Sequence, residues 1–333
     1  MMSTSEILAV LRKAFWLLAF CLLVPLVGFR VYGFDRDYRY YLEFFEQLVA
    51  EPNFDTRFEL GFVWLTKLVI FLAGDDFLIF LLVCAATSLY LKFWIISRGP
   101  AGFFCLLLYV LILLPLHEMT QIRISIAIGL AMLGVFLAAR ESAAGGLSIK
   151  ALLLLLIGAF FQSSILILLP FFYIKFFVRS DRMIIPAVLL TTISFCMGFG
   201  LHLTALLNPL ISAYFENGLE GQVNLFSSRS IAFILVVMLG LICYRRLDSL
   251  TRILLWISFF GLSNYFFLAW APVFAHRFME ISMFPLLLMA CRLPHGFRAL
   301  AFAVLLGLGI YVNYHMIYVD PLFADDFDSW DFA

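Results

Sequence analysis

The sequence predicts an all-α integral membrane protein that crosses the bilayer many times. Of its 333 residues, 64% are hydrophobic and 13% are charged, against about 45–50% and about 25% in soluble domains. A mean hydropathy of +1.04 leaves too few polar groups to cover a water-soluble surface. Stretches such as 151–157 and 253–260 are apolar on all sides, whereas the strands of a membrane β-barrel alternate. Disordered, collagen-like, disulfide-rich and nucleic-acid-binding classes are excluded by the same composition and by the net charge of +0.

Nine apolar runs have the length and composition of membrane-spanning helices. In chain order they are 14–29, 77–96, 101–116, 121–139, 183–200, 230–244, 253–270, 278–291 and 299–317. The basic flank of the first run, Arg12 and Lys13, places the N-terminus in the cytoplasm. No small-residue cleavage site follows this run, so we expect a signal anchor.

Two further stretches are assigned by the positive-inside rule. Residues 59–73 are short and carry Lys67, and residues 149–178 are long and interrupted at Gln162-Ser163-Ser164. If 59–73 lies along the outer interface and 149–178 forms two short helices meeting at Gln162, most Lys and Arg residues lie inside. This arrangement predicts about eleven crossings, with the N-terminus inside and the C-terminus outside.

The chain is expected to form one membrane domain, 1–333, with no soluble domain on either side. A first external loop, 30–76, contains an amphipathic helix near 37–50 and the interfacial helix. A second external loop covers 201–229, and an acidic tail, 320–333, is expected to be external and mobile. The absence of a GxxxxGK[ST] motif argues against ATP hydrolysis.

The loop after the first helix carries the first candidate site residues, Arg30, Asp35, Asp37, Tyr38 and Tyr41. A carboxylate at the bilayer surface, flanked by arginines, has the position of a general base that deprotonates a sugar hydroxyl. The alternative is a charge-balanced, solvated loop whose tyrosines belong to the aromatic belt.

The junction between the third and fourth helices carries His117, Glu118, Gln121 and Arg123. A guanidinium at a helix N-terminus is suited to a diphosphate; alternatively, Arg123 snorkels outward and pairs with Glu118. Gln162, at the break in 149–178, indicates either a cavity wall or a polar kink without a ligand.

A late helix begins with His276 and Arg277. Arg277 is either a second phosphate ligand or the partner of Glu280, three residues further on. With Arg30, Arg123 and Arg229, it would surround an outer cavity with cations suited to an anionic, membrane-bound substrate. No close spacing of His, Asp or Glu supports a metal site, and no cofactor is expected.

Five short motifs follow one another along the chain. They are Arg30 with Gly33-Phe34-Asp35, Tyr38 and Tyr41; Glu59-Leu60-Gly61-Phe62; Gln121-Ile122-Arg123; Phe161-Gln162-Ser163-Ser164 before Leu169-Pro170; and Arg277-Phe278. In this order they resemble the EpsG-type, Wzy-like polysaccharide polymerase family over nearly the whole chain. The chain departs from the family pattern at Phe34, where Thr is usual, at Gln162, where His is usual, and in the order of Gln121 and Arg123. The first loop with its interfacial helix also resembles the multispan, GT-C-like glycosyltransferases that use lipid-linked sugars.

The resemblance implies a polymerase of undecaprenyl-diphosphate-linked oligosaccharide repeat units, as in O-antigen, capsule or exopolysaccharide synthesis. It implies action at the periplasmic face of the bacterial inner membrane, with a chain-length regulator and a flippase as membrane partners. Asp35 is the first choice for the base, with Asp37 and Glu59 as rivals. Arg123 and Arg277 would bind the diphosphate.

Two other classes of function share some of these features. A transporter or flippase of lipid-linked sugars would place polar residues along its whole path, whereas the unusual charges gather on one face here. A glycosyl- or acyltransferase that uses a lipid donor without polymerising differs from a polymerase only through the family resemblance.

Overall fold

The computed structural model describes residues 4–30, 33–35, 37–53, 55–141, 148–172, 183–207, 223–319, 321 and 323–324. Within these residues, 8 helices are long and apolar enough to cross a membrane. They are α1 (Thr4–Gly28), α4 (Phe77–Ile96), α5 (Gly102–Leu108) continued by η1 (Tyr109–Thr120), α6 (Ile122–Glu141), α9 (Ile184–Leu207), α12 (Ser249–Phe267), α13 (Pro272–Ala290), and α14 (His295–Tyr314) continued by η5 (His315–Val319). The chain is therefore a helical, membrane-embedded protein.

Shorter helices complete the described fold. They are the amphipathic α2 (Tyr38–Ala50) and the apolar α3 (Leu60–Ala73), α7 (Ile149–Phe161), η3 (Ser163–Phe172) and α11 (Ser228–Ile242), with a single turn, η4 (Tyr244–Arg246). As predicted, α7 and η3 meet at Gln162. The backbone carbonyl of Gln162 accepts a hydrogen bond from Ile165 N, and its backbone N–H donates to the Gly158 carbonyl in the last turn of α7. Residues 173–178 lie outside the described part. The count of eleven crossings and the orientation of the chain remain predictions.

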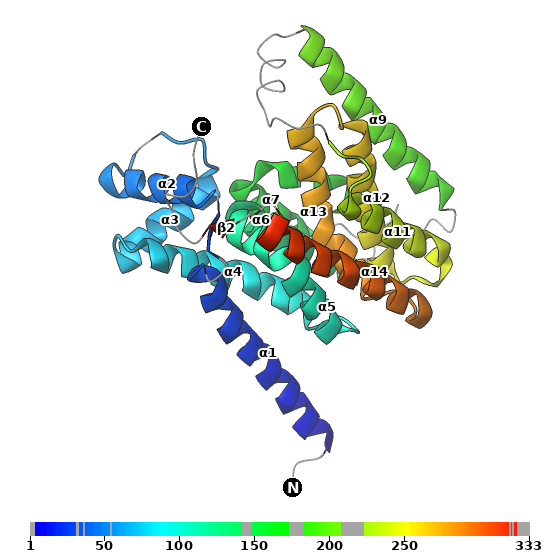
Figure 1. Cartoon of the computed structure of the whole chain (residues 1–333), viewed down its shortest axis with the longest axis horizontal. Helices are drawn as coiled ribbons and strands as arrows, with labels where there is room; N and C mark the ends of the chain where they lie inside the picture. The colour runs from blue at the N-terminus through cyan, green and yellow to red at the C-terminus, as the bar shows by residue number, and fades with distance from the viewer. Residues whose placement is uncertain are drawn as a thin grey trace.

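The helices pack as one bundle from which α1 projects (Figure 1). The helices α12 and α13 lie side by side, α6 packs on both α4 and α7, and α1 runs along α4. Gly261 allows the close approach of α12 to α13, because a Cβ there would lie 1.7 Å from Ser282 Oγ. Small residues at such crossings are typical of helix packing in membranes.

A separate aromatic core holds the segment between α1 and α4. Tyr41, Phe44, Phe45 and Leu48 form the buried face of α2 with the 3–4 spacing of an amphipathic helix. They pack against α3 and the start of α4; the Phe44 and Phe58 ring centroids, for example, lie 4.2 Å apart. This core fixes the starts of α2 and α3.

A short strand pair joins the first loop to the C-terminal segment. Phe34–Asp35 (β1) pairs antiparallel with Phe323–Ala324 (β2), with Asp35 opposite Phe323. The predicted mobile tail is therefore tied down at these two residues, and 325–333 lie outside the described part. The helix α9 extends to Leu207, past the predicted start of the second external loop at 201.

Candidate functional site

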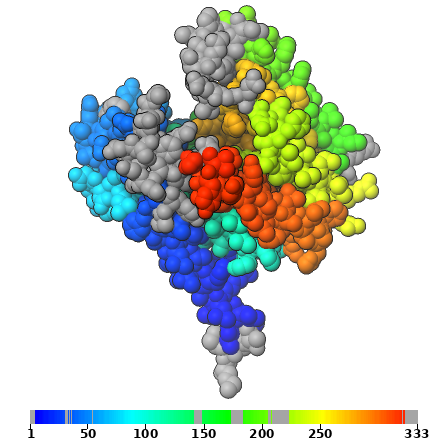
Figure 2. Space-filling model, viewed as in Figure 1, coloured from blue at the N-terminus to red at the C-terminus, as the bar shows by residue number. Residues whose placement is uncertain are grey.

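The predicted site residues gather at one end of the bundle, where α2, α3, α6 and α13 begin. We call it the site end; the opposite end is where α4 and α13 end and α12 and α14 begin. Figure 2 shows the site end hollowed between α11 (lime) and η5 (red), with the start of α13 (gold) at the bottom of the hollow.

The first loop places an arginine and a carboxylate in the protein interior. Arg30 has a φ of 54° and Gly33 a φ of 104°, and Gly33 N donates to the Arg30 carbonyl at 2.8 Å; glycine adopts such a backbone readily. Arg30 Nη1 lies 3.2 Å from Asp35 Oδ2, with both side chains at most 3% exposed. The same Nη1 donates to the Met119 carbonyl. A non-glycine residue keeps a left-handed backbone conformation only where several contacts hold it. The contacts of Arg30 with Asp35 and Met119 do so, and they join the first loop to the η1–α6 turn.

Asp35, the first choice for a base, is 2% exposed. Burial raises the pKa of its carboxyl to about 6; Arg30 opposes the shift and Asp37 adds to it. Its Oδ1 accepts from Asp37 N at 2.8 Å. Asp35 therefore stabilises the loop through its contacts with Arg30 and with Asp37 N. Its carboxylate faces Arg30 and not the hollow.

Asp37 is the partly exposed carboxylate of the loop. It stands immediately before α2, but its side chain makes no capping bond to that helix. Burial raises the pKa of Asp37, and the charges of Arg277 and Arg123 oppose this shift most strongly. The Asp37 carboxylate therefore lies among arginines from two other helices.

Glu59 and Arg123 link three elements. Arg123 Nη1 donates to Glu59 Oε2, with both side chains about a fifth exposed at 22% and 20%. Glu59 Oε1 accepts from Ser163 N at 3.3 Å, which connects the start of α3 to the α7–η3 break. The Arg123 guanidinium also lies 4.6 Å from the Phe58 ring centroid. The alternative pairing of Arg123 with Glu118 is wrong, because Glu118 binds Lys92.

Glu280 connects α13 to the start of α6. Gln121 Nε2 donates to Glu280 Oε1 at 2.6 Å, and the charges of Arg277 and Arg229 both act on this carboxylate. The alternative in which Arg277 simply pairs with Glu280 would place this hydrogen bond on Arg277. Glu280 instead hydrogen-bonds to Gln121. Beside them, the His276 ring packs edge-on against Tyr265 at 5.9 Å.

The two tyrosines of the first loop take different positions. Tyr41 is 5% exposed within the aromatic core; burial raises its pKa to about 12, although the neighbouring Arg123 opposes the shift. Tyr38 is partly exposed, and the Arg30 guanidinium lies 5.8 Å from its ring. Of the two tyrosines, Tyr38 therefore keeps part of its ring accessible.

Several buried polar atoms at this end have no hydrogen-bond partner among the described residues. They include Arg30 Nε and Nη2, Gln121 Oε1, Arg123 Nε, Gln162 Oε1, Glu280 Oε2 and both ring nitrogens of His117. Folded proteins pair or hydrate nearly all buried polar groups. Such a gathering of unused donors and acceptors fits a site that binds a polar ligand. Within the described residues, no group of three or more His, Cys, Asp or Glu could hold a metal ion.

One buried polar cluster, centred on Lys92 and Glu118, is not predicted from the sequence. The positive-inside rule counts Lys92 among the basic residues of the cytoplasmic side, yet its side chain is 0% exposed and paired with Glu118. Ser88, one turn before Lys92 in the same apolar run, was the available signal, since both residues lie on one face of α4.

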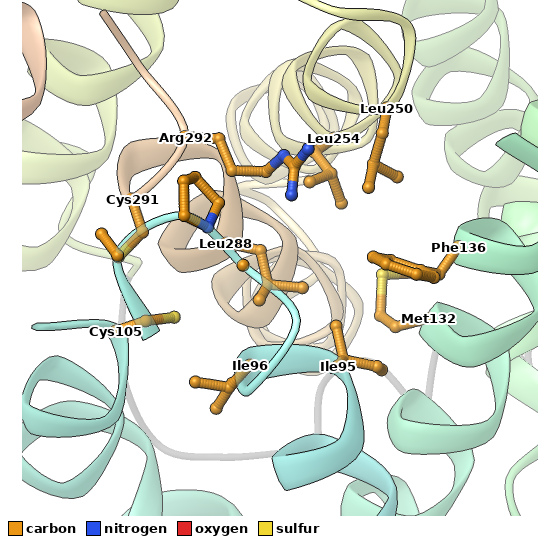
Figure 3. Close-up of a pocket in the computed structure, with 13 residues that line it drawn as sticks. Ile95, Ile96, Cys105, Met132, Phe136, Leu250, Leu254, Leu288, Cys291 and Arg292 are labelled. Atoms are coloured by element: carbon orange, nitrogen blue, oxygen red, sulfur yellow. The ribbon is translucent and has the colours of Figure 1, made fainter. Parts of the chain in front are cut away.

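The opposite end contains cavities of about 240, 550 and 810 Å³ and one small cavity. Its volume is about 20 Å³, room for about one water molecule. Figure 3 shows its apolar walls, which include Met132, Phe136 and Leu288, and a single charged side chain, Arg292. Arg292 is already bonded to Asp248 at 2.8 Å, so the single charge that lines this small cavity is paired.

Comparison with known proteins gives one match. The model of the EpsG family matches residues 13–327, a range that contains every residue of the site end discussed above. No curated protein and no solved structure matches the chain.

Proposed function

The chain belongs to the EpsG family, and from this premise we propose that it polymerises undecaprenyl-diphosphate-linked oligosaccharide repeat units. The family is related to Wzy-like polysaccharide polymerases. The observation that carries the proposal is the convergence of Arg123, Arg277 and Asp37 from three separate elements. A transferase that expels a diphosphate needs cations for the leaving group and a base for the incoming hydroxyl.

The proposed reaction transfers the growing glycan from its lipid carrier to the next lipid-linked unit. A hydroxyl at the non-reducing end of the incoming unit attacks the anomeric carbon of the growing chain. The new C–O bond forms as the bond from that carbon to the phosphate oxygen breaks. The hydroxyl proton goes to the base, and the electron pair leaves with the lipid diphosphate.

Asp37 is the base in this proposal. Asp35 is buried against Arg30, and Glu59 already accepts from Arg123 and Ser163. Asp37 is partly exposed, and its burial-raised pKa makes it a stronger base than an ordinary aspartate. Its position among arginines places a base next to the groups that would hold the leaving diphosphate.

Arg123 and Arg277 bind the diphosphate in this proposal, and Arg229 with Gln121 borders the same site. Arginine suits the task because its planar fork of donors matches phosphate oxygens and keeps its charge. Both lipid carriers reach the site laterally from the bilayer. The orientation predicted from the basic residues would place the site end at the periplasmic face of the inner membrane, where the flippase delivers units and a chain-length regulator acts.

The decisive experiment uses purified protein with synthetic lipid-linked repeat units. We expect polymer from the wild type, and a loss of about 10²–10⁴-fold in turnover for Asp37→Asn, the usual contribution of a general base. Asp35→Asn is expected to lose less. Wild-type turnover in Asp37→Asn together with loss in Asp35→Asn or Glu59→Gln would transfer the role of base to that residue.

Surface glycan from a deletion strain distinguishes the classes of function. Single capped repeats are expected for a missing polymerase. Complete loss of the glycan would instead indicate a flippase, and unchanged chain length would contradict both.

A further inference from the structure

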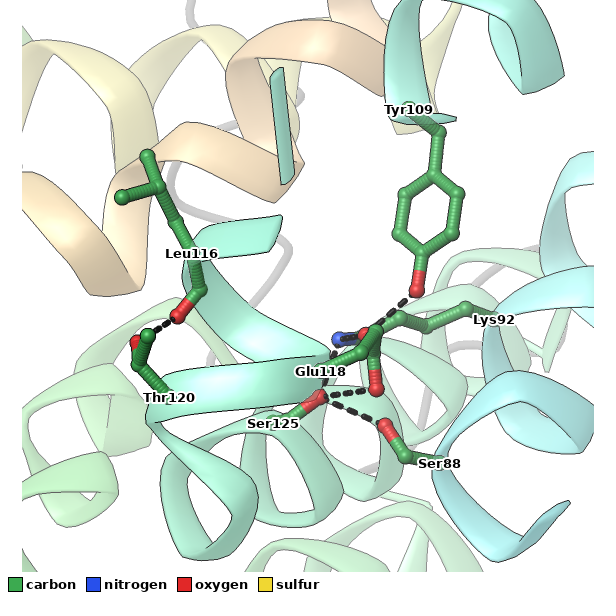
Figure 4. A network of polar contacts seen from close by, with 7 residues as sticks. All are labelled: Ser88, Lys92, Tyr109, Leu116, Glu118, Thr120 and Ser125. Carbon is green, nitrogen blue, oxygen red and sulfur yellow. Dashed lines mark hydrogen bonds and ion pairs between the residues drawn. The ribbon is translucent and has the colours of Figure 1, made fainter. Parts of the chain in front are cut away.

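Behind the site end lies a buried polar cluster formed by Lys92, Glu118, Ser125, Ser88 and Tyr109 (Figure 4). Lys92 Nζ donates to Glu118 Oε1 and, at 2.6 Å, to Ser125 Oγ. Ser125 Oγ donates to Glu118 Oε2 at 2.6 Å, and Tyr109 OH donates to Glu118 Oε1. Since Ser125 has one proton, Ser88 is the donor in the 2.6 Å contact between the two serines.

This cluster is costly in an apolar bundle. The side chains of Lys92 and Glu118 are 0% and 1% exposed, and charges at membrane depth indicate function by default. An apolar pair of similar volume is often as stable as a buried ion pair, or more so. Stability alone therefore does not account for the cluster.

The cluster brackets the turn that carries site residues. Glu118 directly precedes Met119, whose carbonyl accepts from Arg30. Ser125 lies two residues beyond Arg123, and its N–H bonds to the carbonyl of Gln121. The ends of this turn are thus held on α4, and between them Gln121 and Arg123 bond to Glu280 and Glu59 at the site end.

The helix before the turn needs such support. The helix η1 is a π-helix with Pro115 inside it, a form that is rare and frequently found at functional sites. Tyr109, its first residue, bonds to Glu118 near its end. The hydroxyl and the carboxylate therefore tie the two ends of η1 together.

We propose that Lys92 and Glu118 are positioning residues that hold the η1–α6 turn, so that Arg123, Gln121 and the Met119 carbonyl face the site. The proposal rests on the proposed function for its effect on turnover. The position of the turn itself can be measured without any assay of polymerisation.

The main test is the double variant Lys92→Met/Glu118→Leu, which removes both charges at once. Its thermal midpoint is expected to stay near the wild-type value, because no unpaired buried charge remains. Turnover is expected to fall about 10²-fold, as it does when a reacting group is misplaced by about 1 Å. Asn264→Leu is the matched control: it removes a buried hydrogen bond to Ser194 on α9 and leaves the turn intact.

A second readout follows the turn directly. In a background without the six native cysteines, Gln121→Cys is labelled with a maleimide, and Asp55→Cys serves as an exposed reference. The double variant is expected to speed labelling at 121 several-fold and leave it unchanged at 55. Unchanged labelling at 121, or wild-type turnover in the double variant, would overturn the proposal. A third outcome separates the two proposals. If the double variant is labelled faster at 121 but the wild-type protein makes no polymer, the proposed function is rejected and the positioning role is kept.

Tyr109→Phe keeps the proposal testable if the double variant does not insert. It removes one hydroxyl and leaves the ion pair in place. We expect a smaller change in the same direction in both labelling and turnover; no change in either would count against a positioning role.

Discussion

The two ends of the bundle are both rich in arginine but use it differently. At the opposite end, Arg98 and Arg252 have aromatic partners close to them in the sequence, whereas Arg292 bonds to Asp248. Arg98 lies 3.7 Å from the Trp94 ring and donates to the Trp94 carbonyl at 3.0 Å. Arg252 covers the Tyr244 ring at 4.9 Å. At the site end, Arg30 reaches Met119 and Arg123 reaches Glu59, on elements far apart in the sequence.

The comparison shows that the number of cations at a membrane face carries little functional information. Arginines whose partners are close in the sequence anchor helix ends, as the positive-inside rule predicts for the cytoplasmic side. At the site end, by contrast, the charges of Arg123 and Arg277 act from two separate helices on Asp37. The proposed site rests on this convergence and not on the number of arginines.

Labelling from one side of the membrane should give the largest, all-or-none difference between the two ends. Single cysteines at Asp75, near the site end, and at Gly296, at the opposite end, are compared in a background without native cysteines. Gly296 has open space for a side chain. An impermeant thiol reagent in the periplasm should label the cysteine at 75 and leave that at 296 unlabelled. Labelling at 296 alone would reverse the predicted orientation.

Arginine substitutions should differ strongly between the ends. Arg123→Ala and Arg277→Ala are expected to lower turnover about 10²–10³-fold, the usual effect of removing a donor to a developing anion. The corresponding lysine variants should recover little, since lysine lacks the planar fork. Arg98→Lys and Arg292→Lys are the matched controls and should keep near-normal turnover. Near-normal turnover in Arg123→Ala would show that Arg123 pairs with Glu59 but does not bind the diphosphate.

Stability should depend on pH with opposite signs at the two ends. Because burial raises the pKa of Asp35 from 3.8 to about 6, the folded protein binds this proton more tightly than the unfolded chain. Its contribution is therefore complete below pH 3.8 and is lost as the pH rises through 6, a change of about 3 kcal/mol. Thermal midpoints across this range should fall for the wild type and stay flatter for Asp35→Asn.

Asp248 provides the contrast at the opposite end. Burial acts to raise its pKa, but hydrogen bonds from Thr251 and Arg292 lower it overall. Its stabilisation is present above pH 3.8 and is lost as the pH falls below that value. A wild-type midpoint that follows only the Asp248 pattern would contradict the burial of Asp35.

The smallest expected effect compares two helical glycines. A Cβ at Gly61 would lie 2.7 Å from the Phe160 carbonyl oxygen, whereas a Cβ at Gly307 meets nothing within 4 Å. Gly61→Ala should therefore destabilise the protein by about 1–3 kcal/mol through overpacking and move Glu59 away from Arg123. Gly307→Ala should be neutral or stabilising, as alanine favours helix. Equal midpoints for the two variants would show that α3 does not pack on α7 as closely as described.

Features carried by local composition could be predicted from the sequence. The run 77–96 coincides with α4, and the polar break at Gln162 separates α7 from η3. The outer arginines stood out because they opposed the charge bias, and the structure gathers Arg30, Arg123 and Arg277 at one end.

Features that depend on contacts between distant residues could not be predicted. Lys92 is isolated in an apolar run and Glu118 lies 26 residues further on in a polar junction; the fold of α4 and η1 brings the two together. The burial of Asp35 depends on the left-handed backbone of Arg30. A sequence pattern identifies which carboxylates lie in a loop, but not which of them turns inward.

The β1–β2 pair has a consequence for how the protein is made. The strand that contains Asp35 is translated with the first helix, but its partner, Phe323–Ala324, follows the last one. During synthesis β1 therefore waits unpaired at the membrane surface until the ribosome has passed residue 324. A chain released after Arg277 and before Phe323 would contain every arginine of the site and lack the strand that pairs with β1, so termination in this interval would leave an inserted but unfinished protein.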